Sequence, residues 1–170
     1  MSLYLKKLLL VGLMSAGMLS LAAIGKAESN YTPTTHGGNI GLGLEVGGPG
    51  NWGATAKIWM DRKNAFQLAM KFDEGGSAVA QADYLWHNFG IIHMAETKGE
   101  MPLYIGLGGN VLFSNKAAFA GRIPIGISYI FDKKNVPVDI YLQAVPTLWF
   151  FTNNATDFKV YGELGAHYYF

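Results

Sequence analysis

Eight charged residues stand at alternate positions of segments that are otherwise apolar or small. In an extended strand, alternate side chains lie on one face, so these charges share that face with small or polar neighbours. Opposite charges on an enclosed face are expected to pair, because an isolated buried charge is strongly disfavoured. The pattern therefore predicts a network of ion pairs inside a closed sheet. Its four acids and four bases are Glu45, Asp83, Asp139, Glu163, Lys57, Lys71, Arg122 and Lys159.

Metal binding and hydrolysis would both use histidine. His87 and His167 fall on the polar face, but a zinc site would need a third ligand. A hydrogen-bonded structural role is the simpler interpretation for both. Lipid-modifying hydrolysis would need a serine with a histidine base in reach, and Ser77, Ser114 and Ser128 have no histidine on a matching rim. We therefore predict no catalytic residue, no metal site and no cofactor.

Composition argues against several classes of partner. The formal net charge is +1, which gives no reason to expect a nucleic acid or another polyanion, and the absence of cysteine excludes disulfides and thiol catalysis. The glycine-rich run GLGLEVGG at 41–48 has no helix N-terminus after it to hold a phosphate. Inward glycines are instead expected to make room for four large inward rings, those of Trp59, Tyr104, Tyr141 and Tyr161.

The N-terminus has the features of a secretory signal peptide. Two lysines precede an apolar run at 8–24, and small residues follow at 25–27. An uncleaved anchor helix is the alternative, because about 17 apolar residues is the lower limit for spanning a bilayer. The small residues and the polar stretch after them favour cleavage near Ala27. The expected organisation is a signal peptide at 1–27, an N-terminal extension at 28–38 and an exported domain at 39–170.

The exported domain shows repeated two-residue alternation, interrupted by turn sequences such as GGPGN, DRKN and EGGS. No stretch within it has a sustained helical period. The even number of strands, each of about ten residues, suits tilted strands that cross a membrane. The eight expected strands are 39–48, 52–60, 65–73, 78–87, 102–113, 121–131, 138–148 and 158–170.

The distribution of aromatic residues indicates which face is outside. A soluble barrel or sandwich would place its apolar face inward, whereas a membrane barrel reverses the two faces. Large rings on the apolar face lie near strand ends, while the strand middles carry aliphatic residues and glycine. Such girdles predict an all-β fold, an eight-stranded antiparallel up-and-down transmembrane β-barrel. The rings are those of Trp52, Phe72, Trp86, Phe113, Phe131, Phe158, Tyr168 and Phe170.

The last ten residues, YGELGAHYYF, alternate strictly up to a final aromatic, as expected if the last strand pairs with the first. With this feature the chain resembles a family of small bacterial outer-membrane β-barrels, many grouped as a domain of unknown function, and is similar to OmpA/OmpX-type barrels. The resemblance implies that Tyr168 and Phe170 form the signal read by the barrel assembly machinery. The matching stretches are GLGLEVGGPGNWGATAKIWMDRKNAF, QADYLWH, MPLYIGLGGNVLF, GRIPIGISYIF, VPVDIYLQAVPTL and GAHYYF.

The expected function is that of a non-enzymatic, monomeric protein integral to outer-membrane lipid. It would have a mostly plugged polar lumen and a role in envelope integrity or in surface interaction. A narrow pore and a lipid A-modifying enzyme are the alternatives. Strand parity places the turns at 61–64, 88–101 and 132–136 in the periplasm. The expected outer loops, GGPGN, EGGS, SNKA and WFFTNNATD, are short for a surface receptor.

Overall fold

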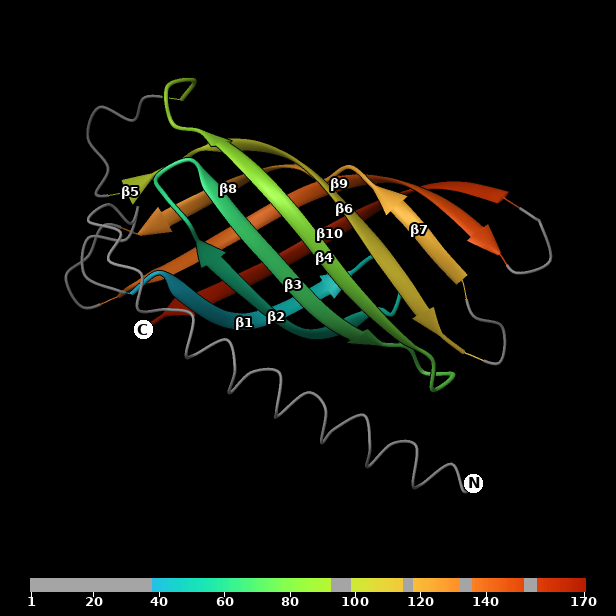
Figure 1. The fold of residues 1–170 in the computed structure, drawn as a ribbon. Helices are drawn as coiled ribbons and strands as arrows, with labels where there is room; N and C mark the ends of the chain where they lie inside the picture. Colours follow the sequence, from blue (N-terminus) through green and yellow to red (C-terminus); the bar gives the residue numbers. More distant parts are fainter. Residues whose placement is uncertain (1–37, 93–98, 115–117, 132–135, 152–155) are drawn as a thin grey trace. The chain divides into compact units, whose positions relative to one another are not determined.

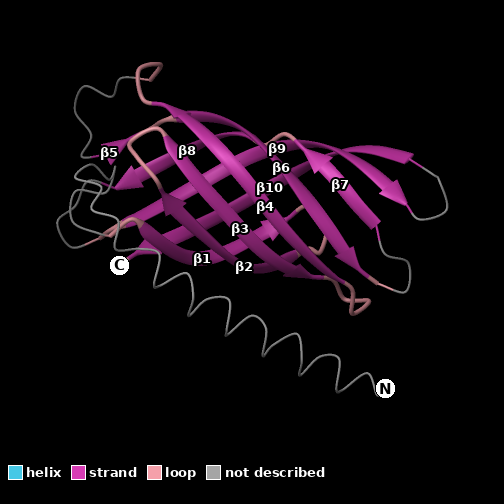
Figure 2. Ribbon diagram, in the orientation of Figure 1, coloured by secondary structure: helices cyan, strands magenta, loops and turns pink. Residues whose placement is uncertain are grey.

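The computed structural model describes residues 38–92, 99–114, 118–131, 136–151 and 156–170. The predicted signal peptide at 1–27 and nearly all of the extension at 28–38 lie outside these residues. The described residues form strands joined by turns, in one antiparallel sheet (Figures 1 and 2). Among them there is no helix long and apolar enough to cross a membrane.

Eight main strands form a partial ring. Strand β1 pairs with β2 on one side and with β10 on the other, and β10 also pairs with β9. Figure 1 shows the tilted strands following one another around this arrangement. The prediction of an all-β, antiparallel fold is therefore confirmed. The strands are β1 (Ile40–Gly47), β2 (Trp52–Trp59), β3 (Asn64–Phe72), β4 (Ala78–Asn88), β5 (Gly99–Glu100), β6 (Leu103–Phe113), β7 (Ala118–Arg122), β8 (Ile125–Phe131), β9 (Val138–Phe151) and β10 (Thr156–Tyr169).

Strands β7 and β8 take the place of the single strand predicted at 121–131, and β7 begins earlier than predicted, at Ala118. Pro124 lies between them, and proline has no N–H to donate to a sheet ladder. The neighbouring groups bridge the interruption: Gly106 N donates to Pro124 O at 2.8 Å, and Ile123 N donates to Pro146 O at 3.0 Å. Both halves pair with β6 and with β9, so they act as one strand of the ring.

Two expected connections differ in the structure. Both ends of the outer loop WFFTNNATD, predicted over 149–157, are strand, because β9 continues to Phe151 and β10 begins at Thr156; residues 152–155 lie outside the described residues. Aromatic and β-branched residues suit extended structure, and Phe150 pairs with Thr156 across the hairpin. The segment at 88–101 contains the short strand β5, which pairs with β8.

The C-terminal end of β10 is held by the first strand. Tyr169 pairs with Gly41, and Phe170 N donates to Ile40 O at 3.1 Å. The last aromatic residues are therefore tied into the sheet, as the alternation of the final segment predicts.

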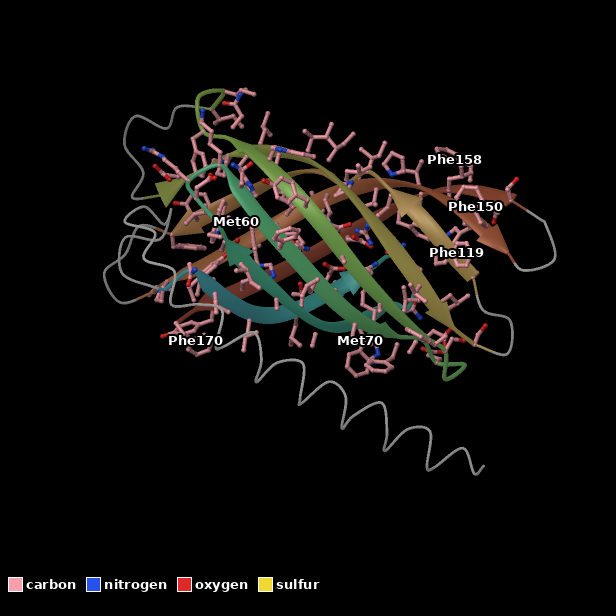
Figure 3. All side chains as sticks on the ribbon, in the orientation of Figure 1. Met60, Met70, Phe119, Phe150, Phe158 and Phe170 are labelled. Carbon is pink, nitrogen blue, oxygen red and sulfur yellow. The ribbon has the colours of Figure 1, made fainter. Side chains whose placement is uncertain are left out.

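The outer face of the ring is apolar, with large rings toward its two ends. Phe119 and Phe150 are cross-strand partners, and Phe158 lies beside them at the β9–β10 hairpin (Figure 3). Met60 and Phe170 lie at the opposite end. Leu44, Leu107, Leu142 and Val160 are among the exposed aliphatic side chains between the two ends.

Candidate functional site

Seven of the eight predicted network residues are buried on the inner face of the ring, each with an exposed fraction of at most 3%. They are Glu45, Lys57, Lys71, Asp83, Arg122, Asp139 and Glu163. Their contacts divide them into two groups. We call the first the glutamate cluster, which consists of Glu45, Lys71, Asp83, Arg122 and Glu163. We call the second the aspartate cluster, which consists of Thr55, Lys57, Asp139, His167 and Tyr169.

In the glutamate cluster each base contacts two acids. Lys71 Nζ lies 2.6 Å from Glu45 Oε1 and 2.7 Å from Glu163 Oε1. The Arg122 guanidinium lies 3.2 Å from Asp83 Oδ1 and also pairs with Glu163. Glu163 therefore joins both bases. Because these side chains are almost completely withdrawn from water, each contact is screened much less than a surface ion pair would be.

Side-chain amides occupy the remaining positions around the acids. Gln143 Nε2 donates to Glu163 Oε2 at 2.6 Å, and Gln81 Nε2 lies 3.3 Å from the other oxygen of the same carboxylate. Gln67 Nε2 donates to Glu45 at 3.2 Å. Sequence reasoning assigned no role to these amides. The signal was available, because Gln67 and Gln81 alternate with the charged residues of their own strands.

The aspartate cluster is built around one carboxylate. Asp139 Oδ2 accepts from Lys57 Nζ at 3.2 Å and from the Tyr169 hydroxyl at 2.8 Å. Asp139 Oδ1 lies 2.8 Å from His167 Nδ1. The Lys57 ammonium also lies 4.6 Å from the centroid of the Trp59 ring, a cation–π distance. In this cluster a single acid thus serves two nitrogen bases and a phenol.

Glycines opposite the large inward rings keep the clusters compact. A Cβ at Gly126 would collide with the Tyr104 ring, and a Cβ at Gly165 would collide with the Tyr141 hydroxyl. Both rings are almost fully buried, and their hydroxyl groups donate to Gln143 and to Glu45. This agrees with the expectation that inward glycines make room for inward rings.

The assignment of Lys159 to the network is corrected by the structure. Its side chain is 55% exposed and pairs with Asp157 at 3.0 Å. The alternation places Lys159 on the correct side of β10, but β1 pairs only with residues 163–169 of that strand. Position 159 therefore lies beyond the last residue of β1, where the inner face is open to solvent.

Two apolar clusters lie toward opposite ends of the inner face. Near the β3–β4 turn, the cluster consists of Val79, Leu112, Ala118, Ala120 and Trp149. Near the β2–β3 turn, it consists of Trp59, Ala65, Phe89, Ile130 and Tyr169. The charged groups lie between these two clusters. Apolar side chains at both ends separate the charges from bulk water.

One arrangement in the aspartate cluster resembles a catalytic relay. Thr55 Oγ1 lies 3.1 Å from His167 Nε2, and His167 Nδ1 faces Asp139. Sequence reasoning missed Thr55, because it searched only serines for a nucleophile. All three side chains are at most 2% exposed, so no substrate reaches the hydroxyl in this conformation. We interpret the relay as a structural hydrogen-bond chain.

The other candidates for chemistry lie apart. His87 Nδ1 lies 3.2 Å from Lys63 O, and the imidazole is 4.4 Å from the Trp59 ring, centroid to centroid. Ser128 is buried, and Ser77 lies in the β3–β4 turn, where its N–H donates to Asp73. Within the described ranges there is no group of three histidine, cysteine or acidic residues that could hold a metal ion.

Comparison with known proteins adds no match: no family model, curated protein or solved structure resembles this chain at a significant level. The expected membership of this chain in the family of OmpA/OmpX-like barrels stays a prediction. A proposal of function therefore depends on the geometry of the inner and outer faces.

Proposed function

We propose that this protein is an eight-stranded transmembrane β-barrel of the bacterial outer membrane, with a plugged lumen and a non-enzymatic role in envelope integrity. The proposal keeps the expected resemblance to small outer-membrane barrels. It also keeps the expected monomeric state, the export by a signal peptide and the assembly signal at Tyr168 and Phe170.

The observation that carries the proposal is the inverted polarity of the sheet. Lys57, Lys71 and Asp139 are completely buried, whereas Leu44, Trp52 and Phe158 are 60–68% exposed. In water this arrangement would expose a continuous apolar surface far larger than monomeric soluble proteins show. In a bilayer the same surface faces acyl chains, and the backbone groups are satisfied by pairing around the ring.

The aromatic residues support the same placement. Pairs of neighbouring rings occur at both ends of the outer face, with Trp52 and Phe72 at one end and Tyr168 and Phe170 at the other. Amphipathic rings favour the two interfaces of a bilayer, and aliphatic side chains favour its centre. The outer face would therefore contact lipid along the whole length of the strands.

Fractionation and detergent extraction test this placement. We expect the exported protein to sediment with the outer membrane, to need detergent for extraction and to migrate faster in its folded form than after heating. A soluble periplasmic protein that needs no detergent would contradict the proposal. The test uses the native protein. A variant with a substitution inside the ring could misfold and be degraded in any compartment, so its loss would not show where the native protein resides.

Cysteine labelling tests the orientation, since the native chain has no cysteine. Lys63 and Glu74 are both exposed turn residues, at opposite ends of β3. We expect a membrane-impermeant maleimide to label Glu74→Cys in intact cells and to label Lys63→Cys only after permeabilisation. The reverse result would invert the orientation.

Conductance and genetics test the role. The pairing of the buried charges and the apolar clusters at both ends support a closed lumen, so we expect planar bilayers to show no steady single-channel current. A large steady current would favour the narrow pore. Deletion of the gene should increase sensitivity to detergent and to bulky antibiotics, and the native gene should reverse it. A deletion strain with unchanged sensitivity and altered lipid A acylation would favour the enzyme instead.

A further inference from the structure

The first half of β10 has a free edge among the described residues. Strand β1 pairs with residues 163–169 of β10, and one further bond runs from Gly48 N to Gly162 O at 3.1 Å. On its other side, β10 pairs with β9 as far as Thr156. Figure 1 shows β9 and β10 running on beyond the ends of β1 and β2. Residues 156–161 therefore have a partner strand on one side only.

The alternation of the strand determines which backbone groups lie at this edge. Gly162 O points toward β1, and successive residues of a strand point their N–H and C=O groups to opposite sides. Thr156, Phe158 and Val160 therefore point both groups away from β9. No described residue pairs with these groups. Lipid cannot satisfy them, so they need either water or another strand.

The side chains of this segment leave the edge accessible to another strand. Phe158 and Val160 are 63% and 61% exposed on the outer face, and both residue types favour sheets. A lysine commonly protects a sheet edge from pairing, but Lys159 pairs with Asp157 at 3.0 Å, and the two together carry no net charge. Proline would also protect an edge, and residues 156–161 contain none.

We propose that residues 156–161 of β10 are a docking site for an extended segment of another protein, which adds to the sheet as an antiparallel strand. The added strand takes up the free N–H and C=O groups of β10. Charge complementarity defines its chemistry, with a basic residue opposite Asp157 and an acidic residue opposite Lys159. An apolar residue lies opposite Phe158, so the docked segment alternates between polar and apolar side chains.

A second copy of this chain does not fit the edge. Antiparallel pairing of two β10 edges points the two rings in opposite directions, whereas all copies enter a membrane in one orientation. Parallel pairing about a two-fold axis places Phe158 and Val160 of one copy on the same side of the joined sheet as the charged side chains of the other. This choice of occupant rests on the proposed membrane placement, but the free edge does not.

Binding of a synthetic peptide tests the site. The peptide TVDVKVT places its aspartate opposite Lys159 and its lysine opposite Asp157 when its central valine pairs with Phe158. The ¹⁵N-labelled native protein, folded in detergent, is titrated with this peptide, and amide hydrogen exchange is followed by nuclear magnetic resonance. We expect exchange of the Phe158 and Val160 N–H groups to slow by about tenfold or more. Unchanged exchange of both groups up to the solubility limit of the peptide would overturn the proposal.

Two controls distinguish strand addition from non-specific binding. N-methylation of the three valines of the peptide removes the N–H groups that face β10, so the methylated peptide should slow neither exchange rate. Phe158→Ala and Phe158→Pro both remove the ring, but only proline removes the N–H at the edge, a position where proline is tolerated. We expect the peptide to protect Val160 in Phe158→Ala and not in Phe158→Pro.

Equal protection of Val160 in the two variants, or equal protection by the methylated peptide, would overturn the proposal. If Phe158→Pro does not fold, the methylated peptide still provides the comparison on the native protein.

Sedimentation of the native protein without peptide tests the choice of occupant. We expect one species at all protein concentrations. A concentration-dependent dimer that is present in Phe158→Ala and absent in Phe158→Pro would show that a second copy occupies the edge, and would overturn the assignment to another protein. Fractionation tests the membrane placement separately, so a soluble protein that binds the peptide would contradict the proposed function and not the docking site.

Discussion

The two buried clusters neutralise their charges in different ways. In the glutamate cluster, Lys71 and Arg122 each contact two acids and share Glu163, so each base keeps an acid if Glu163 is lost, and Glu163 keeps a base if either base is lost. In the aspartate cluster, Lys57 and His167 both depend on Asp139. The first cluster is redundant and the second has a single hub. The damage from a substitution should therefore depend on which cluster it affects, more than on the charge that it removes.

The difference follows from the strands that supply the residues. The glutamate cluster draws side chains from β1, β3, β4, β7 and β10, which surround a common space. The aspartate cluster draws on β2, β9 and β10, and aromatic rings such as Trp59 fill the space beside it. Where rings occupy the interior, fewer polar partners are available to each charge.

Asp139→Asn should have the largest effect. It leaves Lys57 buried without a counter-charge and removes the carboxylate that His167 contacts, and breaking a buried pair in this way destabilises by about 3–5 kcal/mol. The measurement is the free energy of unfolding in urea with the protein in detergent or lipid. Asp157→Asn removes an acid that is 43% exposed in its pair with Lys159, and is the matched control. Equal losses for the two variants would contradict a hub at Asp139.

Arg122→Ala should destabilise less, by about 3 kcal/mol, at the lower end of the scale for buried pairs. Glu163 keeps Lys71 at 2.7 Å after this change, and only Asp83 loses its base. Unfolding midpoints measure the loss, with Arg62→Ala as the control, because the Arg62–Glu100 pair is about half exposed. An unchanged melting temperature in Arg122→Ala would place this side chain outside the network.

Lys159→Met should change the stability little, by about 0.5 kcal/mol or less, as for other exposed ion pairs. Lys71→Met, the same substitution on the same side of the sheet, should be far more damaging because Lys71 is fully buried between two acids. Thermal unfolding of both variants gives the comparison. A large loss of stability in Lys159→Met would indicate that this lysine belongs to the buried network.

The smallest effect concerns the turn between β2 and β3. The pKa of Asp61 lies below its usual value, because the Asn64 side chain and the backbone N–H groups of Lys63 and Asn64 donate to the carboxylate. This stabilisation is present above the unfolded-state pKa and is lost as the pH falls through the lowered folded-state pKa. Asp61→Asn should therefore be slightly less stable than the native protein at neutral pH, and the difference should disappear in acid. A difference in stability between the two proteins that grows as the pH falls would contradict this prediction.

Alternation made much of the fold predictable from the sequence. A residue's side of a strand follows from its parity, and this placed Glu45, Lys57 and Asp139 on the buried face and Leu44 and Trp52 on the exposed face. Parity does not reveal where a strand ends relative to its neighbours. The extent of β9 and β10, and with it the exposure of Lys159, depends on cross-strand pairing over the hairpin.

The sequence did not reveal which residues of the network contact one another. Asp139 and Lys57 are 82 positions apart, and Thr55 and His167 are 112 apart. Their contacts depend on the pairing of β1 with β10 and of β10 with β9, which aligns distant segments in one register. Knowledge of that register would have placed Lys57 and His167 beside Asp139 and Lys159 outside the network.

The sequence by itself determined that the chain forms alternating strands with charges on one face and apolar residues on the other. The reason is local, since a two-residue period follows from the geometry of an extended backbone. Only the tertiary structure decided which charges meet, which lie beyond the ring and which acid has to serve two bases. Those outcomes depend on the lengths and registers of strands that are distant in the chain, and no local pattern contains that information.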